Sequence, residues 1–156
     1  MRNLTWGQID FLKQVLTVGQ SKTAAGAGRT IPLNGTLLRV FADHMKWYEE
    51  EVGPANPDSY IFPFGKAKHY KASQPMQTLK TAWRNVLRKA GVKIRLHDLR
   101  HTVVTKLCEA GASEETIMQI CGHVSRRMLT RYAHIRTEAK RSALEAIKTH
   151  PVETVR

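Results

Sequence analysis

The stretch His-Asp-Leu-Arg-His-Thr, residues 97–102, is the densest group of chemically versatile side chains in the sequence. His97 and His101 are four residues apart, as in the H-E-x-x-H motif of zinc hydrolases, although Asp98 replaces the glutamate and no third ligand is evident. His97 and Arg100 are three residues apart, so a helix would bring an imidazole and a guanidinium to one face, which suits a phosphate. A helix start with a capping histidine and a solvated arginine explains the same residues without any chemistry.

Residues 110–132, just downstream, allow a different class of protein. Their small and apolar positions have the spacing of a helix-turn-helix, with residues 125–132 as the recognition helix. Arg126, Arg127 and Arg131 would then face DNA. On this interpretation the chain is a binding module with no catalytic activity.

The charge of the chain points to a polyanionic partner. It carries 25 Lys and Arg against 13 Asp and Glu, a net charge of +12, and its sequence pI is about 10.1. Eleven of the cations lie between Lys66 and Lys106, where Asp98 is the one acid. Such an excess favours a nucleic acid partner, and the clustering is typical of a surface that follows a phosphate backbone.

Length and composition exclude several classes of protein. A chain of 156 residues suits one domain with its own core, and 42% hydrophobic with 24% charged residues is typical of a globular protein. No apolar run approaches the roughly 20 residues of a membrane helix, so no membrane partner is expected. Two cysteines can form at most one disulfide, which is too few to hold together the fold of a chain of this size. This favours a cytoplasmic protein with free thiols.

Hydrophobic periodicity predicts an α+β fold that is mainly α, with a small antiparallel sheet at its N-terminal side. Residues 15–18 and 30–33 are predicted strands of a hairpin whose tip is 21–29, and residues 54–75 are predicted to be rich in loops. Helical spacing or caps predict helices over residues 37–52, 79–90, 97–110, 113–122 and 125–133. Thr137 is predicted to cap a last helix that ends near Ile147.

Three motifs in this order and spacing resemble the tyrosine recombinase (phage integrase) family: His-Asp-Leu-Arg-His-Thr at 97–102, Cys-Gly-His at 121–123 and Arg-Tyr-Ala-His at 131–134. Upstream, residues 4–10 resemble the segment that precedes the family's first strands. Residues 21–23 and 29–33 are similar to its lysine-bearing hairpin. The resemblance covers residues 1 to about 148 and implies the fold of the family's catalytic domain.

The resemblance implies site-specific recombination or integration of DNA, by strand cleavage and rejoining through a 3′-phosphotyrosyl intermediate. Tyr132 matches the nucleophile, and Arg100 matches the arginine that binds the non-bridging phosphate oxygens. His97 matches a histidine that transfers a proton or contacts phosphate, and His123 matches a hydrogen-bond donor to phosphate. Lys22 matches the hairpin lysine that protonates the 5′-oxygen leaving group.

Two further histidines of the motifs, His101 and His134, are expected to orient their neighbours rather than to react. No cofactor, metal or small-molecule substrate is expected. The phosphotyrosyl bond preserves the energy of the broken phosphodiester, and arginine and lysine supply the positive charge that magnesium supplies in other phosphoryl transfers. The sequence has no carboxylate cluster suited to a two-metal site.

One departure from the family concerns the first arginine of its phosphate site, which lies on a helix upstream of the segment that begins at Leu4. Arg2 is too close to Leu4 to match that arginine. We therefore expect residues 1–148 to be a catalytic domain without its first arginine and its core-binding domain, and residues 149–156 to be a tail. The alternative is a catalytically incomplete, DNA-binding remnant of the same fold; a helix-turn-helix regulator is a further one.

The expected partners are double-stranded DNA and other protomers in a synaptic assembly on it, within the nucleoid of a bacterium or phage-infected host. The segment from Thr137 to Ile147 has a narrow apolar stripe, Ala139, Ala143, Leu144 and Ile147. Such a helix is marginal alone and needs a partner surface. The resemblance implies that this tail docks on a neighbouring protomer, and a helix folded back on its own domain is the alternative.

Overall fold

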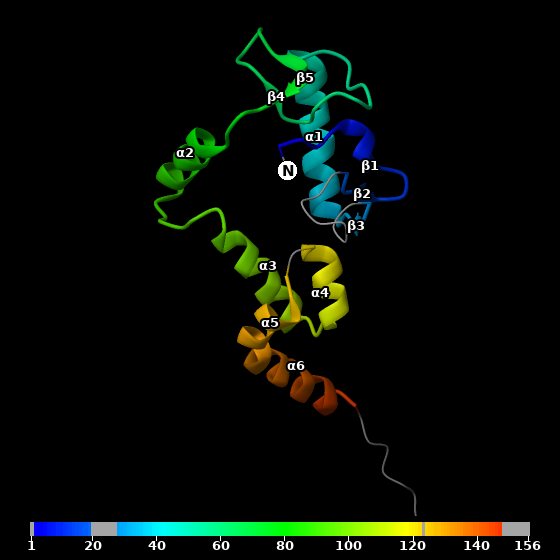
Figure 1. Ribbon diagram of the computed structural model, residues 1–156, viewed down its shortest axis with the longest axis vertical. Helices are drawn as coiled ribbons and strands as arrows, with labels where there is room; N and C mark the ends of the chain where they lie inside the picture. Colours follow the sequence, from blue (N-terminus) through cyan, green and yellow to red (C-terminus); the bar gives the residue numbers. More distant parts are fainter. Residues whose placement is uncertain (1, 20–27, 123, 148–156) are drawn as a thin grey trace, which may run out of the picture. The chain divides into compact units, whose positions relative to one another are not determined.

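The structure is a computed structural model that describes residues 2–19, 28–122 and 124–147 (Figure 1). The chain divides into two compact units, an N-terminal unit of residues 1–93 and a C-terminal unit of residues 94–156. Each unit is described by itself below.

A three-stranded antiparallel sheet opens the N-terminal unit, directly after the 3₁₀ turn η1 (Trp6–Gln8). Its strands are β1 (Ile9–Asp10), β2 (Val15–Thr17) and β3 (Thr30–Pro32), in that spatial order. Leu16 of β2 pairs with Ile9 on one side and Ile31 on the other, so three apolar side chains lie in one row across the sheet. The two predicted strands are confirmed, whereas most of the predicted hairpin tip, with Lys22, lies outside the described residues.

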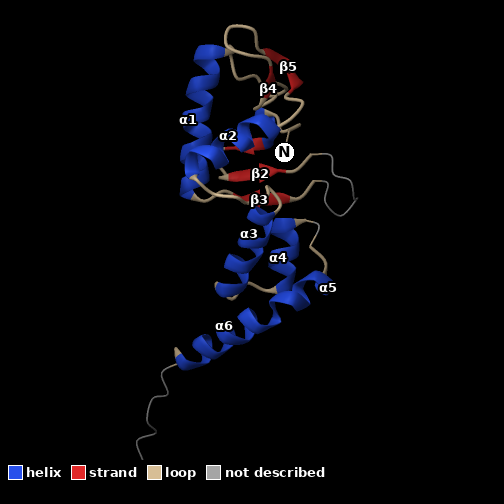
Figure 2. Cartoon of the chain, turned by 90° about the vertical axis from the view of Figure 1, so that its left-hand side faces the viewer, coloured by secondary structure: helices blue, strands red, loops and turns tan. Residues whose placement is uncertain are grey.

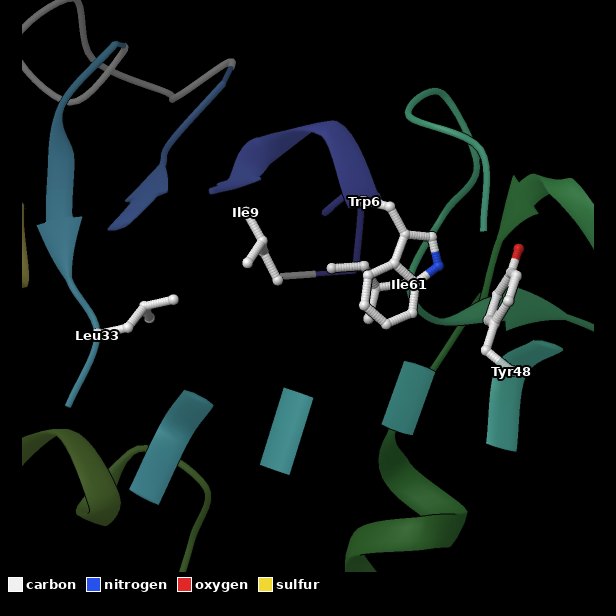
Figure 3. Close-up of a cluster of buried hydrophobic side chains, with 5 residues drawn as sticks. All are labelled: Trp6, Ile9, Leu33, Tyr48 and Ile61. Atoms are coloured by element: carbon white, nitrogen blue, oxygen red, sulfur yellow. The ribbon is translucent and has the colours of Figure 1, made fainter. Parts of the chain in front are cut away.

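The helix α1 (Gly35–Glu51) follows the sheet and closes the first core. Asn34 caps it, because its side-chain oxygen accepts a hydrogen bond from the Leu37 N–H at 2.9 Å. The core consists of five buried side chains, shown in Figure 3: Trp6, Ile9, Leu33, Tyr48 and Ile61. The Trp6 and Tyr48 rings meet edge to face at 5.4 Å, which fixes α1 against the strands.

The segment predicted to be rich in loops, residues 54–75, is mostly loop but also contains a second small sheet that was not predicted. β4 (Pro63–Phe64) pairs with β5 (Lys71–Pro75) as an antiparallel hairpin with an irregular register. β4 has two residues and β5 has five, and each strand has a proline at one end. Strands this short do not show the alternation of apolar and polar residues on which a strand prediction rests. The helix α2 (Lys80–Ala90) follows, and Gly91 ends it at a φ of 66°, as predicted from the glycine.

Over its described residues, the C-terminal unit consists of helices joined by short loops and contains no strand (Figure 2). Its elements are α3 (Asp98–Glu109), α4 (Glu114–Cys121), α5 (Arg126–Leu129), the 3₁₀ turn η3 (Thr130–Tyr132) and α6 (Ala133–Glu145). As predicted, Ser113 caps α4 by accepting a hydrogen bond from the Thr116 N–H, and Gly122 ends it at a φ of 74°. The predicted helix over 125–133 is instead one α-helical turn followed by a 3₁₀ turn.

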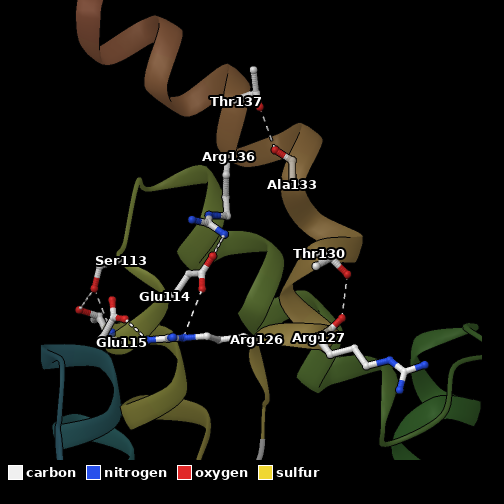
Figure 4. A network of polar contacts seen from close by, with 10 residues as sticks. Ser113, Glu114, Glu115, Arg126, Arg127, Thr130, Ala133, Arg136 and Thr137 are labelled. Carbon is white, nitrogen blue, oxygen red and sulfur yellow. Dashed lines mark hydrogen bonds and ion pairs between the residues drawn. The ribbon is translucent and has the colours of Figure 1, made fainter.

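The last helix begins five residues earlier than predicted, with Tyr132 rather than Thr137 at the N-cap position. Thr137 lies inside α6, where its hydroxyl donates a hydrogen bond to the Ala133 carbonyl at 3.1 Å (Figure 4), and it does not cap the helix. The Tyr132 side chain makes no capping hydrogen bond at the start of α6. Tertiary contacts hold this first turn instead, because Ile135 packs on the core and Arg136 pairs with Glu114. These contacts override the local capping preference.

Five residues form the buried core of the C-terminal unit: Val104, Cys108, Ile117, Val124 and Leu129. Tyr132 and Ile135 pack against its edge, so η3 and the start of α6 are attached to α3 and α4. Burial raises the pKa of the Cys108 thiol, as expected for a small core side chain. Within the residues that the structure describes, no helix is long and apolar enough to cross a bilayer.

Replacement of Leu129 by alanine is expected to lower the free energy of unfolding of the C-terminal unit by about 2–5 kcal/mol, since this fully buried leucine would leave a cavity. Leu12→Ala removes a leucine that is 93% exposed and should change stability by less than about 0.5 kcal/mol. Urea unfolding of both variants measures the difference. Equal midpoints for the two variants would show that Leu129 is not a core residue in solution.

Candidate active site

The first turn of α3 is held by an ion pair that leaves His97 exposed. Asp98 accepts hydrogen bonds from the Arg95 guanidinium at 2.9 Å and from the Arg95 backbone N–H at 2.9 Å. These contacts hold the pKa of the Asp98 carboxyl below its ordinary value. His97 stands at the N-cap position without a side-chain capping bond. The Asp98 carboxylate is thus occupied by its hydrogen bonds with Arg95. This disfavours a role for Asp98 as the general base of a zinc hydrolase motif.

The Tyr132 hydroxyl lies against the same helix. It is 2.6 Å from Nδ1 of His101, and the two rings are stacked with their centroids 6.4 Å apart. His97, one turn earlier on α3, meets the His101 ring edge-on at 5.1 Å. The structure therefore brings Tyr132 into contact with His101, 31 residues away in sequence, and His101 in turn contacts His97.

Arg100 carries an unneutralised charge beside this contact. Its side chain is half-buried, and it forms no hydrogen bond or ion pair with any other residue in the described part of the chain. It precedes His101 directly and lies three residues after His97 on α3. A partly desolvated guanidinium without a counter-ion is suited to bind an anion, and its planar fork matches the oxygens of a phosphate.

A network of ion pairs fixes the helix that follows Tyr132 (Figure 4). Arg136 of α6 pairs with Glu114 of α4 at 2.5 Å, and Arg126 of α5 pairs with Glu115 at 3.0 Å. Arg136 is 22% exposed and Glu114 30%, so their pair is better shielded from solvent than those on the surface. The backbone on the C-terminal side of Tyr132 is anchored to α4 by this contact.

The helix-turn-helix interpretation is wrong. Its recognition helix would need residues 125–132, but α5 spans four residues and then becomes 3₁₀. Arg126, which that interpretation directs to DNA, contacts Glu114 and Glu115 within the unit. A single helical turn with its first arginine engaged in this way does not present a surface that enters a major groove.

Two members of the predicted catalytic set, Lys22 and His123, lie outside the described residues. The structure brings together Tyr132 and His97 through His101, and places Arg100 on the same helix. His101 was expected only to orient a neighbour, and the structure identifies that neighbour as Tyr132. The spacing of four residues between His97 and His101 was the sequence signal that both imidazoles share one face of α3.

Exposed cations are arranged in a row on α2. Lys80, Arg84 and Arg88 are four residues apart and all exposed, so they share one face of a helix that carries no acid.

Among the described residues, no group of three or more His, Cys, Asp or Glu side chains is arranged to hold a metal ion. Arg2, which the sequence did not match to the family's first arginine, donates a hydrogen bond to the Gln77 carbonyl.

An open pocket of about 470 Å³ lies within the N-terminal unit. Its walls are largely aromatic, with Trp47, Phe62 and Tyr70 among its lining residues. His44, the histidine in this lining, forms a hydrogen bond between its Nε2 and the Ile61 carbonyl oxygen at 2.8 Å, and its ring stacks on Trp47. The pocket contains none of the residues matched by the motifs, and we do not assign it to the reaction.

Comparison with known proteins gives a consistent result along most of the chain. The sequence profile of the phage integrase family matches residues 1–139. The integrase of Salmonella phage P22 is 33% identical over 139 residues, which cover 85% of this chain and 34% of that protein. Tyrosine recombinase XerA of Pyrococcus furiosus is 30% identical over 146 residues, covering 92% of this chain and 47% of the relative. The chain thus spans half or less of the length of these relatives.

Two solved structures share the fold. A crystal structure of XerA recombinase superposes with a TM-score of 0.64 at 21% identity, over 95% of this chain and 52% of that one. A structure of the Tn1549 transposon integrase in complex with circular intermediate DNA gives 0.62 at 22% identity, over 91% of this chain and 50% of that one. The predicted fold class, mainly α with a small antiparallel sheet, is confirmed.

Proposed function

Because this chain belongs to the phage integrase family, we propose that it forms the catalytic part of a tyrosine-type site-specific recombinase, which cleaves and rejoins DNA through a 3′-phosphotyrosyl intermediate. The observation that supports this most directly is the position of the Tyr132 hydroxyl on α3, 2.6 Å from His101 and within a turn of Arg100. In this proposal residues 1–148 are the catalytic domain and residues 149–156 a tail.

Each residue of the set has a distinct role in the proposed reaction. The Tyr132 oxygen attacks the scissile phosphorus, so that an O–P bond to tyrosine forms while the bond from phosphorus to the 5′-oxygen breaks. Arg100 binds the non-bridging oxygens, where negative charge develops. His97 transfers a proton or contacts the phosphate, His123 donates a hydrogen bond to the phosphate, and Lys22 protonates the departing 5′-oxygen. Attack by a 5′-hydroxyl reverses the step, and no cofactor is proposed.

Double-stranded DNA is the proposed substrate. The basic row Lys80, Arg84 and Arg88 on α2 supports a surface that follows the phosphate backbone, as does the exposure of every cation from Lys66 to Lys106 except Arg100. Contacts of this kind release counterions, so the affinity should fall steeply with salt concentration. The proposed location is the nucleoid in the cytoplasm of a bacterium or phage-infected host.

The proposed function is tested by trapping the covalent intermediate. A suicide substrate, nicked so that the released 5′-end diffuses away, should accumulate a protein–DNA adduct with a version of the chain extended upstream to supply the first arginine. Mass spectrometry should find the DNA on Tyr132. Specific DNA binding without any adduct would contradict the proposal and favour the catalytically incomplete remnant.

We also propose that the end of α6 docks on a neighbouring protomer. The first turns of this helix pack within their own unit through Ile135 and Arg136, but Leu144 is 69% exposed and Ile147 is 65% exposed. Leu144 lies in the last turn of α6 and Ile147 two residues beyond its end, and such exposed apolar side chains gain burial only against another surface. A second protomer on the same DNA would supply that surface and would link the position of Tyr132 to assembly.

The double substitution Leu144→Ser with Ile147→Ser should weaken association of protomers on DNA and leave the stability of the single chain unchanged, since both side chains are exposed within the unit. Sedimentation of the protein with DNA that carries two binding sites measures the association. Leu12→Ser, which alters another exposed leucine, is the matched control. If the double variant associates on DNA as the parent does, α6 does not dock in trans.

A further inference from the structure

We propose that Glu114 is a positioning residue for the Tyr132 nucleophile. Its carboxylate ties the two segments on either side of Tyr132, α5 and α6, to the first turn of α4. This inference rests on the proposed function, because it takes Tyr132 as the nucleophile. It adds a residue that none of the three sequence motifs contains.

The two carboxylate oxygens of Glu114 are engaged by two different arginines (Figure 4). Oε1 accepts a hydrogen bond from Arg136 Nη1 at 2.5 Å, and Oε2 forms an ion pair with Arg126 Nε at 3.9 Å. The next residue, Glu115, binds Arg126 Nη2 at 3.0 Å. Arg126 lies six residues before Tyr132 and Arg136 four residues after it, so the two acids hold the chain on both sides of the nucleophile.

The start of α4 is a firm attachment point for this carboxylate. Glu114 is the first residue of α4, where the free backbone N–H groups and the helix dipole favour a negative charge. Ser113 caps the helix by accepting a hydrogen bond from the Thr116 N–H, and Ile117 is fully buried in the core of the C-terminal unit. The cap and the core therefore hold α4 independently of the arginines.

The segment that carries Tyr132 has little local structure of its own. α5 spans four residues and η3 three, and the Tyr132 side chain makes no capping bond at the start of α6. Leu129 and Ile135 pack on the core, but apolar packing is non-directional and does not fix the rotation of a short helix. The charge-assisted bond from Arg136, about one helical turn after Tyr132, supplies that direction.

The Arg136–Glu114 pair is partly shielded from solvent. Its side chains are 22% and 30% exposed, against 73% and 47% for Lys106 and Glu109, which form an ion pair at the end of α3. Solvent and salt screen a partly buried pair less than an exposed one, so the loss of the Glu114 charge should have the larger effect. The Lys106–Glu109 pair is therefore a matched control within the same unit.

The proposed reaction depends on where this segment places the Tyr132 oxygen. The Tyr132 hydroxyl bonds to His101 and not to Glu114, so Glu114 acts on the nucleophile through the arginines and the backbone that they hold. In reactions of this kind a misplacement of about 1 Å costs about 10²-fold in rate. A contact one turn from the nucleophile is close enough to produce a shift of that size.

The position of Tyr132 is tested first, in the chain as it stands. Fluorine NMR of protein labelled with fluorotyrosine reports the surroundings of each tyrosine ring, and Tyr132→Phe identifies the Tyr132 signal. Glu114→Gln keeps the shape of the side chain and removes its charge. It should shift or broaden the Tyr132 signal, because that ring stacks on His101 and senses its ring current. Glu109→Gln should leave the signal unchanged. An unchanged signal in Glu114→Gln would overturn the inference whatever the catalytic result.

The effect on the reaction is tested in the upstream-extended version at saturating DNA. Adduct formation by Glu114→Gln should be about tenfold slower than by Glu109→Gln, with equal DNA affinities, because each variant loses one negative charge. Arg136→Lys, which keeps the charge without the planar fork, should lose less than Arg136→Gln. The double variant Glu114→Gln with Arg136→Gln should be no slower than the slower single variant, since the two residues act as one pair.

The outcomes separate positioning from stabilisation. If folded Glu114→Gln forms the adduct as fast as Glu109→Gln, or if the losses of the two single variants add in the double variant, the pair does not position Tyr132. A faster Glu114→Gln would show that the pair restrains Tyr132, and the inference would be wrong. If Glu114→Gln does not fold, Arg136→Gln breaks the same pair from the other side and takes its place. An extended parent that forms no adduct contradicts the proposed function and this inference together, whereas an active parent with an equally active Glu114→Gln contradicts this inference alone.

Discussion

Replacement of Tyr132 by phenylalanine is expected to abolish the covalent protein–DNA adduct while DNA affinity is largely kept. The change removes one oxygen, the atom proposed to bond to phosphorus, and alters no formal charge. In the proposed complex, DNA affinity depends mainly on cations that contact phosphates, and the exposed row on α2 proposed for this role remains. Denaturing gel electrophoresis after incubation with a suicide substrate measures the adduct, and a filter-binding or anisotropy titration at fixed salt measures the affinity.

The phenylalanine variant is a clean test because the ring stays in place. Tyr132 packs on the core of the C-terminal unit through its ring, and the variant loses one hydrogen bond to His101, which contributes about 0.5–1.5 kcal/mol to stability. Tyr70→Phe, at a half-buried tyrosine of the N-terminal unit, is the matched control and should form the adduct normally. An adduct from Tyr132→Phe at normal yield would disprove the nucleophile assignment.

Local signals in the sequence predicted most of the helices because each signal acts over a few residues. Ser113 caps α4 and Gly91 ends α2, since a side-chain acceptor and a left-handed backbone act where they stand. The start of α6 was not predictable in this way. Thr137 is of a residue type that often caps helices, but Ile135 and Arg136 make tertiary contacts that extend the helix back to Ala133.

The same distinction applies to the candidate site. Resemblance of short motifs led us to propose Arg100, His97 and Tyr132 as site residues, and helical spacing predicted that His97 and His101 share one face. Nothing in the spacing predicted that the Tyr132 hydroxyl would reach His101, because that contact depends on how η3 packs across the core. Long-range contacts of this kind depend on the tertiary structure, and a single sequence does not encode them in any local pattern.

Replacement of Arg100 by alanine is expected to slow adduct formation by about 10²–10³-fold at saturating DNA, the usual cost of losing an electrostatic stabiliser of the transition state. The guanidinium is half-buried and has no counter-ion among the described residues, so its removal should not destabilise the fold. Single-turnover trapping in the upstream-extended version measures the rate, and urea unfolding measures the stability.

Arg100→Lys separates charge from geometry at this position. Lysine keeps the positive charge but lacks the planar fork that binds two phosphate oxygens, so its rate should lie between those of the parent and of alanine. Arg141→Ala is the matched control, because this exposed arginine of α6 is paired with Glu138 and lies outside the proposed site. If Arg100→Ala slows the reaction no more than Arg141→Ala does, Arg100 does not contact the scissile phosphate.

Arg100→Ala could also raise the free energy of unfolding while it slows the reaction. That result would show that the unpaired charge of Arg100 serves catalysis and lowers the stability of the fold.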